Sequence, residues 1–218
     1  MPCQILLIGD SVIDNGAYVL ADQPDVARQL RAIMPSHEIE MRAVDGSVTK
    51  DVIDRQLSGL RDDDLVVLSS GGNDALAHVD LIAPGSGSGV LAEFADFPHQ
   101  SLVAAILSHV RKIQAAFQVD YANLLDAVAA EDRRVLCLTI YNPLFEANGL
   151  TADQQRAAEA AVALFNDVIQ REAIRRGCGV LEMRSLLVDA ADFANPIEPS
   201  AIGGAKIASA VKRWATDV

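Results

Sequence analysis

The chain has 218 residues, of which 50% are hydrophobic and 22% charged, a composition that favours a packed globule over a disordered chain. Its formal net charge of -12 disfavours nucleic acid and anionic membrane surfaces as partners. No apolar run approaches the roughly 20 residues of a membrane span, and residues 1–10 lack a basic leader, so we expect a soluble, cytoplasmic protein. This length fits one domain over residues 1–218.

Five short aliphatic runs alternate with longer segments of helical periodicity, the order typical of βαβ units and a parallel sheet. Between the runs, apolar residues recur every three or four positions, as at Val103, Ile106 and Val110, and predict helices that pack on the sheet. The pattern predicts an α/β domain with a five-stranded parallel sheet. The predicted strands are residues 4–8, 38–44, 65–69, 134–140 and 179–183.

Helix ends and one long loop can also be predicted. Thr151 and Gln154 form a capping-box pattern, so we expect a helix from Thr151 to near Gly177, where glycine suits the left-handed position after a helix. Ser200 is the expected cap of the last helix. The glycine- and proline-containing segment 79–98 breaks the alternation and predicts a surface loop that could cover a site as a lid.

Small and polar residues follow the ends of four predicted strands. Residues 9–11 follow the first strand, 45–47 the second and 71–74 the third, while the fifth leads through a polar loop to 195–200. In open parallel sheets, ligands bind beyond the carboxyl ends of the strands. The sequence therefore predicts a binding or catalytic site at this edge.

These residues include the parts that acyl transfer requires: a nucleophile, a base and hydrogen-bond donors for the developing oxyanion. Ser11 leaves its strand on a tight turn after Gly9, which permits an unusual backbone angle. The N–H of Ser11, the N–H of Gly46 and the side-chain amide of Asn73 could form an oxyanion hole. Taken singly, Ser11 also fits a helix N-cap and Asn73 a turn, so the prediction depends on their joint placement.

Three sequence blocks resemble those of SGNH/GDSL hydrolases. Gly9-Asp10-Ser11 is similar to the first block, Gly46 to the second, and residues 71–74, Gly-Gly-Asn-Asp, to the third. The family has a three-layer α/β/α, flavodoxin-like fold and mostly cleaves esters through a serine without a cofactor. The resemblance implies that Ser11 is the nucleophile, that Ser11, Gly46 and Asn73 form the oxyanion hole, and that the partner is a small-molecule ester, with no metal.

The last block of that family, Asp-x-x-His, has an altered counterpart. Its frame matches over residues 199–203, but Asn195 stands at the aspartate position and Glu198 at the histidine position. The ordinary pKa is about 4.3 for Glu and about 6.5 for His, so Glu198 would be the weaker base unless burial raises its pKa. Asn with Glu⁻ also keeps the single negative charge of Asp⁻ with neutral His. We predict a Ser11–Glu198 dyad that a hydrogen bond from the Asn195 amide supports.

The leading interpretation is a serine hydrolase that cleaves small acyl or acetyl esters through a Ser11 acyl-enzyme, with Glu198 as base. His99, just after the 79–98 segment, is an alternative base. A second interpretation is a binding module of the same fold that holds ligand carbonyls but lacks a working base. A third is a cation site, because hard cations prefer several oxygen ligands. Its ligands would be Asp10, Asp14, Asp74 and Glu198.

Overall fold

The computed structural model of the protein describes residues 4–78, 99–129, 133–145, 149 and 151–217. The predicted loop or lid at 79–98 lies outside these residues. Within the described part, no helix has both the length and the apolar character that a membrane span needs.

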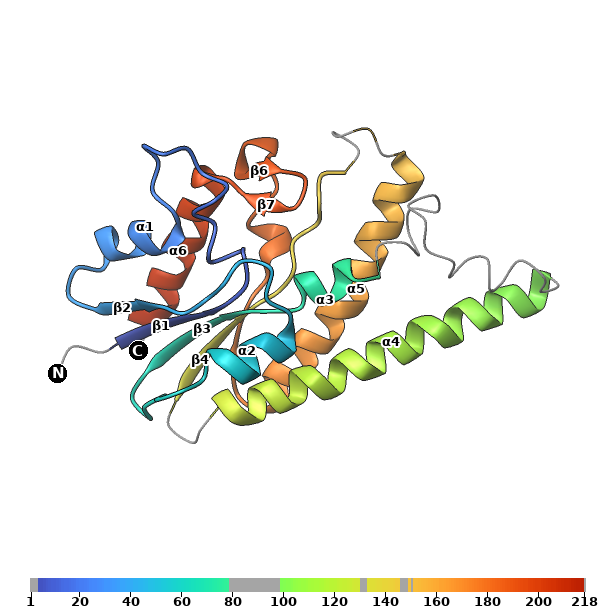
Figure 1. Cartoon of the computed structure of the whole chain (residues 1–218), viewed down its shortest axis with the longest axis horizontal. Helices are drawn as coiled ribbons and strands as arrows, with labels where there is room; N and C mark the ends of the chain where they lie inside the picture. Colours follow the sequence, from blue (N-terminus) through green and yellow to red (C-terminus); the bar gives the residue numbers. More distant parts are fainter. Residues whose placement is uncertain (1–3, 79–98, 130–132, 146–148, 150, 218) are drawn as a thin grey trace.

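The centre of the fold is a five-stranded sheet with strand order β2-β1-β3-β4-β5 (Figure 1). All four neighbouring pairs are parallel. The strands are β1 (Gln4–Gly9), β2 (Glu38–Met41), β3 (Leu65–Ser69), β4 (Arg134–Leu138) and β5 (Gly179–Leu181). The predicted α/β fold with a five-stranded parallel sheet is confirmed.

Helices cover both faces of this sheet and complete three layers. In Figure 1, α1 and α6 lie together on one face, whereas α2, α4 and α5 lie on the other, in agreement with the two separate apolar cores. The helices are α1 (Val26–Ile33), α2 (Thr49–Arg55), α3 (Gly72–Leu76), α4 (His99–Val128), α5 (Ala152–Arg175) and α6 (Ala201–Thr216).

Strand β1 shows how the sequence builds both cores. Ile5 and Leu7 belong to the core beneath α1 and α6, while Leu6 and Ile8 belong to the core beneath α4 and α5. Successive side chains of a strand point to opposite faces, and both faces of this sheet are covered. For this reason the central strands appear in the sequence as unbroken apolar runs.

Strands β2, β4 and β5 end two or three residues earlier than predicted. After β4, the side-chain amide of Asn166 on α5 bonds both the N–H and the C=O of Ile140, each at 2.7 Å. After β5, the N–H of Met183 donates to the Thr139 hydroxyl at 2.8 Å. Side chains thus replace strand partners here, and the sheet edge opens where the site lies.

The predicted helix ends are confirmed. The Thr151 hydroxyl accepts from the N–H of Gln154, and the Gln154 side chain accepts from the N–H of Thr151, so the capping box begins α5. Gly177 follows α5 with φ +70°. The Ser200 hydroxyl accepts from two N–H groups in the first turn of α6.

A small antiparallel pair, which the sequence did not predict, lies near the carboxyl edge of the main sheet (Figure 1). It consists of β6 (Phe193–Asn195) and β7 (Glu198–Pro199). The Asn15 amide donates to the Pro199 carbonyl at 3.2 Å. A Cβ atom on Gly203 would lie 2.2 Å from the carbonyl oxygen of Asp192, the residue just before β6, so glycine lets the start of this β6–β7 hairpin pack closely on α6.

Candidate active site

Ser11 is presented by the close approach of two central strands. Gly9 ends β1 with φ +130°, and a Cβ atom there would lie 1.9 Å from the Ser69 carbonyl oxygen on β3. The Gln56 side chain bonds both the N–H and the C=O of Gly9, at 2.7 and 2.9 Å. Only glycine fits this position, and the next turn places the nearly buried Ser11 at the carboxyl edge of the sheet.

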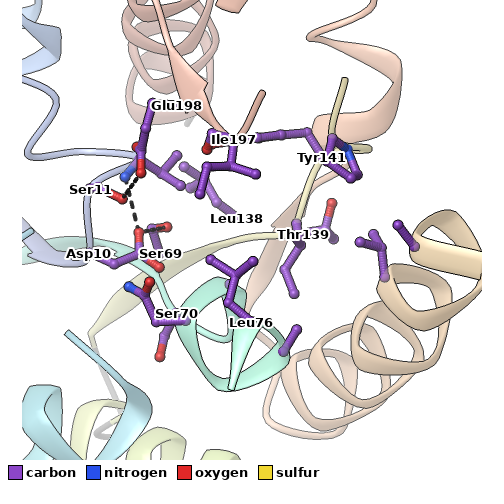
Figure 2. Close-up of a pocket in the computed structure, with 18 of the residues that line it drawn as sticks. Asp10, Ser11, Ser69, Ser70, Leu76, Leu138, Thr139, Tyr141, Ile197 and Glu198 are labelled. Atoms are coloured by element: carbon purple, nitrogen blue, oxygen red, sulfur yellow. Dashed lines mark hydrogen bonds between the residues drawn. The ribbon is translucent and has the colours of Figure 1, made fainter. Parts of the chain in front are cut away.

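Glu198 meets Ser11 from the hairpin. The Ser11 hydroxyl donates to Glu198 Oε1 at 3.1 Å, although the two residues are 187 positions apart. Figure 2 shows the two side chains pointing toward each other. Glu198 is only 7% exposed. Its Oε2 has no hydrogen-bond partner among the described residues. Burial raises the pKa of Glu198 to about 7; the Ser11 bond opposes this rise, while Asp45 and Asp10 add to it.

Asn195 lies on the exposed side of the hairpin, where it pairs with Glu198 through the backbone ladder. Its side-chain carbonyl accepts from the N–H of Ile197 at 3.0 Å. Within the described part of the chain, no hydrogen bond joins the Asn195 amide to the Glu198 carboxylate. Asn195 therefore shapes the turn that carries Glu198 and does not touch the carboxylate itself.

The three expected oxyanion donors come from three strand ends. Asn73 is the second residue of α3 and lines the same pocket as Ser11. One N–H of its amide donates to the Ser47 carbonyl at 3.0 Å, which ties Asn73 to the loop that carries Gly46. Gly46 has φ +79° and is exposed. Because an amide carries two N–H groups, Asn73 keeps a second donor for a ligand.

Asp10 is a second buried carboxylate beside Ser11, at 2% exposure. Its Oδ1 accepts from the Ser69 hydroxyl at 2.6 Å and from the N–H of Val12 at 3.2 Å. Burial raises the pKa of Asp10 to about 6, the two hydrogen bonds oppose this rise, and the charge of Asp74 adds to it. Two carboxylates with raised pKa values therefore neighbour Ser11.

The carboxylates of the alternative cation site are engaged elsewhere. Asp14 accepts from the N–H of Asp45 at 3.0 Å, and Asp74 accepts from the N–H and the hydroxyl of Thr49 at 3.0 and 2.9 Å. Among the described residues, no group of three or more His, Cys, Asp or Glu is placed to hold a metal ion. The other alternative, His99, begins α4, but its side chain lies outside the described part.

A largely apolar pocket opens beside Ser11 and Glu198 (Figure 2). It contains about 780 Å³ of space, part of which is open to solvent. Its walls come from α3, the end of β4, the following segment and α5. Apolar lining residues include Leu76, Leu138, Ile140, Phe145, Val162 and Ile197.

The sequence did not identify the wall formed by α5, nor Tyr141. Tyr141 is buried, lines the pocket and donates from its hydroxyl to the carbonyl of Ile197, next to Glu198. An aromatic residue just after a predicted strand, in a chain with 5% aromatics, was the available signal. The part of the pocket wall on α5 has no distinct sequence signal, because its inner residues follow the ordinary helix periodicity.

Comparisons with known proteins identify the family. The sequence profile of the GDSL-like lipase/acylhydrolase family matches residues 7–204. A phospholipase A1 from Streptomyces albidoflavus has 19% identity and a TM-score of 0.65 over 98% of this chain and 99% of that chain. An extracellular lipase from Streptomyces rimosus has 19% identity and a TM-score of 0.66 over 98% and 100%.

An acetyl-xylooligosaccharide esterase of Geobacillus, solved as a mutant, has 15% identity and a TM-score of 0.63 over 99% of this chain and 94% of that chain. No curated protein sequence matches the chain. At these identities the likeness between structures shows the fold, while the family profile spans most of the sequence. The protein belongs to the GDSL-like lipase/acylhydrolase family.

Proposed function

We propose that the protein is an ester hydrolase that acts through a Ser11 acyl-enzyme, with Glu198 as the base. The observation that carries this proposal is the 3.1 Å hydrogen bond from the Ser11 hydroxyl to Glu198 Oε1. This distance lies within the range of about 2.6–3.2 Å over which a base takes a proton from a nucleophile. Family membership supports ester hydrolysis as the reaction class.

A buried carboxylate has the base strength that this role requires. An ordinary Glu would be almost fully ionised at neutral pH but too weak a base, whereas a pKa of about 7 suits proton transfer near neutrality. We interpret residues 195–198 as an altered form of the family's Asp-x-x-His block. In the acetylxylan esterase from Geobacillus stearothermophilus, a catalytic mutant replaces a histidine with alanine. Here Glu198 would take the role of such a histidine.

In the first half of the reaction, the Ser11 oxygen attacks the ester carbonyl carbon while its proton passes to Glu198. The N–H groups of Ser11 and Gly46 and the free N–H of Asn73 stabilise the oxyanion. The intermediate then collapses, and Glu198 gives the proton to the departing alcohol. In the second half, Glu198 takes a proton from water, which attacks the acyl-enzyme, and returns that proton to Ser11. Asn195 acts as a positioning residue through its turn.

Two substitutions test the dyad with a short p-nitrophenyl ester. Ser11→Ala should abolish hydrolysis, because it removes the oxygen on which the proposed acyl-enzyme forms. Glu198→Gln keeps the shape and removes the base, so kcat/KM should fall at least tenfold. Matched controls are Ser108→Ala and Glu38→Gln at exposed positions, which should keep native activity.

Three outcomes would contradict the proposal in different ways. Full activity in Glu198→Gln would remove Glu198 as base. Loss of activity in His99→Ala, with Glu198→Gln still active, would transfer the role to His99. A native protein that binds ester ligands, but whose Ser11 does not react with a fluorophosphonate probe, would be the binding module instead.

The pH profile gives a further check of the base. Because Glu198 must be ionised to accept a proton, kcat/KM should rise about tenfold per pH unit below pH 7 and level off above it. A profile that is flat from pH 5 to 8 would contradict a base with this pKa.

A further inference from the structure

The pocket extends well beyond the groups that perform the chemistry. It begins at Ser11, Asn73 and Glu198 and continues between α3 and the end of β4 to the inner side of α5. An acetyl group has a single methyl beyond the carbonyl carbon. The proposed reaction with an acetyl ester would therefore leave most of this pocket unfilled.

Small side chains form the far wall on α5. Ala158, Ala161 and Val162 line the pocket there, and Ala158 and Val162 are buried. Opposite them, Leu76 from α3 and Leu138 from β4 contribute aliphatic surface. Such a lining gives an alkyl chain apolar contact on several sides, and the small residues of α5 set how far the chain can extend.

The charged groups at the pocket are all of one sign. Among the described residues that line it, the ionisable acids are Asp10 and Glu198, and there is no Lys, Arg or His. A substrate carboxylate or phosphate placed in this pocket would lose its hydration and meet negative charge without a compensating cation. The described part of the lining therefore disfavours anionic groups.

The acyl part of the ester is the better occupant than the alcohol part. After the first half of the reaction the alcohol leaves, while the acyl chain stays on Ser11 until water attacks, so an apolar pocket beside Ser11 suits the group that stays. Tyr18 and Asp45, next to Gly46, form an exposed polar pair at 2.8 Å that is not part of the pocket lining. That polar surface suits the departing alcohol.

We propose that this pocket binds the acyl chain and that the enzyme prefers neutral, unbranched acyl groups longer than acetyl, with Ala161 on α5 as a determinant of chain length. The inference rests on the proposed hydrolase function and specifies its substrate class. Each buried methylene contributes about 0.8 kcal/mol, which corresponds to roughly a fourfold gain in kcat/KM per carbon until the wall is reached.

Two substrate series test the assignment in the native protein. The first keeps p-nitrophenol as alcohol and lengthens the acyl chain from acetate through butyrate and hexanoate to octanoate; the optimum should lie at butyrate or longer. The second keeps acetate and lengthens the alcohol from ethyl to hexyl, and should change kcat/KM much less. An optimum at acetate, or a steeper dependence on the alcohol, would overturn the proposal.

A charged analogue tests the exclusion of anions. The p-nitrophenyl monoester of succinic acid has the same chain length as the butyrate ester but ends in a carboxylate. The butyrate ester should be hydrolysed at least tenfold more efficiently. Equal efficiencies would show that the pocket does not select against negative charge and would overturn this part of the inference.

The wall itself is tested by Ala161→Phe, which places a ring in the pocket. The ratio of octanoate to acetate hydrolysis should fall at least tenfold. Ala163→Phe makes the same change at an exposed position of the same helix and should leave the ratio unchanged. If Ala161→Phe fails to fold, Ala161→Val provides a smaller obstruction with the same direction of effect. An unchanged ratio in a folded variant would overturn the role of Ala161.

The two proposals fail in distinguishable ways. If no ester in either series is cleaved and Ser11 does not react with a fluorophosphonate, the hydrolase function fails. If p-nitrophenyl esters are cleaved through Ser11 without dependence on acyl length, only the acyl-chain assignment fails.

Discussion

The proposed nucleophile and the proposed base are held by two regions of very different construction. Ser11 follows the central strand β1, where Gly9 is clamped between the Ser69 carbonyl and the Gln56 side chain. Glu198 lies on a two-stranded hairpin outside the main sheet. The first region fixes both the backbone and the residue types, because nothing larger than glycine fits. The second is a short hairpin whose turn is closed by the Asn195 side chain, so it can shift more easily than the first.

The largest effect should come from Gly9→Ala. The added Cβ would lie 1.9 Å from the Ser69 carbonyl at φ +130°, and two paired central strands cannot separate to make room. We expect a loss of about 3 kcal/mol or more in the free energy of unfolding, measured in urea. Gly16→Ala is the control, since its nearest atom would be 3.9 Å away. Near-native stability of Gly9→Ala would show that the strands yield here.

The base region should show a stability that depends on pH. The pKa of Glu198 is about 7 in the folded protein and its ordinary value is 4.5, so the folded state holds this proton more tightly. Stability is therefore lost as pH rises from about 4.5 to above 7. Relative to the native protein, Glu198→Gln should be more stable at pH 8, by roughly 1–2 kcal/mol after solvent screening, and similar at pH 4.5.

Urea unfolding at both pH values measures this difference, with Glu38→Gln as the matched exposed control. The same substitution should lower activity and raise stability at pH 8, the combination expected when a protein maintains a strained group for catalysis. Equal stabilities of Glu198→Gln and the native protein at pH 8 would contradict an unfavourable buried carboxylate.

Gly203→Ala should cost less than Gly9→Ala, although its added Cβ also meets a carbonyl, that of Asp192, at 2.2 Å. The hairpin has short strands and can shift away from α6. We expect a loss of about 1–3 kcal/mol, together with lower esterase activity because Glu198 moves with the hairpin. If Gly203→Ala were as destabilising as Gly9→Ala, the two regions would be equally rigid and the contrast between them would disappear.

The smallest effect concerns Asn195. Asn195→Ala removes the acceptor for the N–H of Ile197 and should cost about 0.5–1.5 kcal/mol and a few-fold in activity. Asn195→Asp keeps an acceptor and should be close to native in both stability and kcat/KM. If the Asn195 amide instead donated to Glu198 during the reaction, Asn195→Asp would impair activity at least as much as Asn195→Ala.

Local signals in the sequence predicted much of the fold. The Thr151–Gln154 capping box and Gly177 mark the ends of α5 because the groups that satisfy them lie within a few residues. The end of β4 was misplaced because Asn166, 26 positions from Ile140, takes up the backbone groups that a strand would use. No local pattern reveals such a partner.

In the site, too, features with local sequence signals could be predicted, whereas features that depend on distant contacts could not. Gly9, Ser11 and Asn73 could be assigned to one edge because each follows a strand end. The hairpin could not be predicted, since Pro196 and Pro199 argue against strands and its place depends on contacts with Asn15 and α6. The predicted hydrogen bond from the Asn195 amide to Glu198 is not formed, because the Asn195 side-chain carbonyl accepts from the N–H of Ile197 and closes a turn instead.

The hairpin is also fastened to the pocket wall. The Tyr141 hydroxyl donates to the Ile197 carbonyl, and the N–H of Leu144 donates to the Pro196 carbonyl at 2.8 Å. In laboratory evolution of this protein, substitutions in two parts of the pocket lining would therefore have different effects. Changes around Tyr141 would alter substrate fit and turnover together, whereas changes on α5 would alter substrate preference while leaving the support of Glu198 untouched.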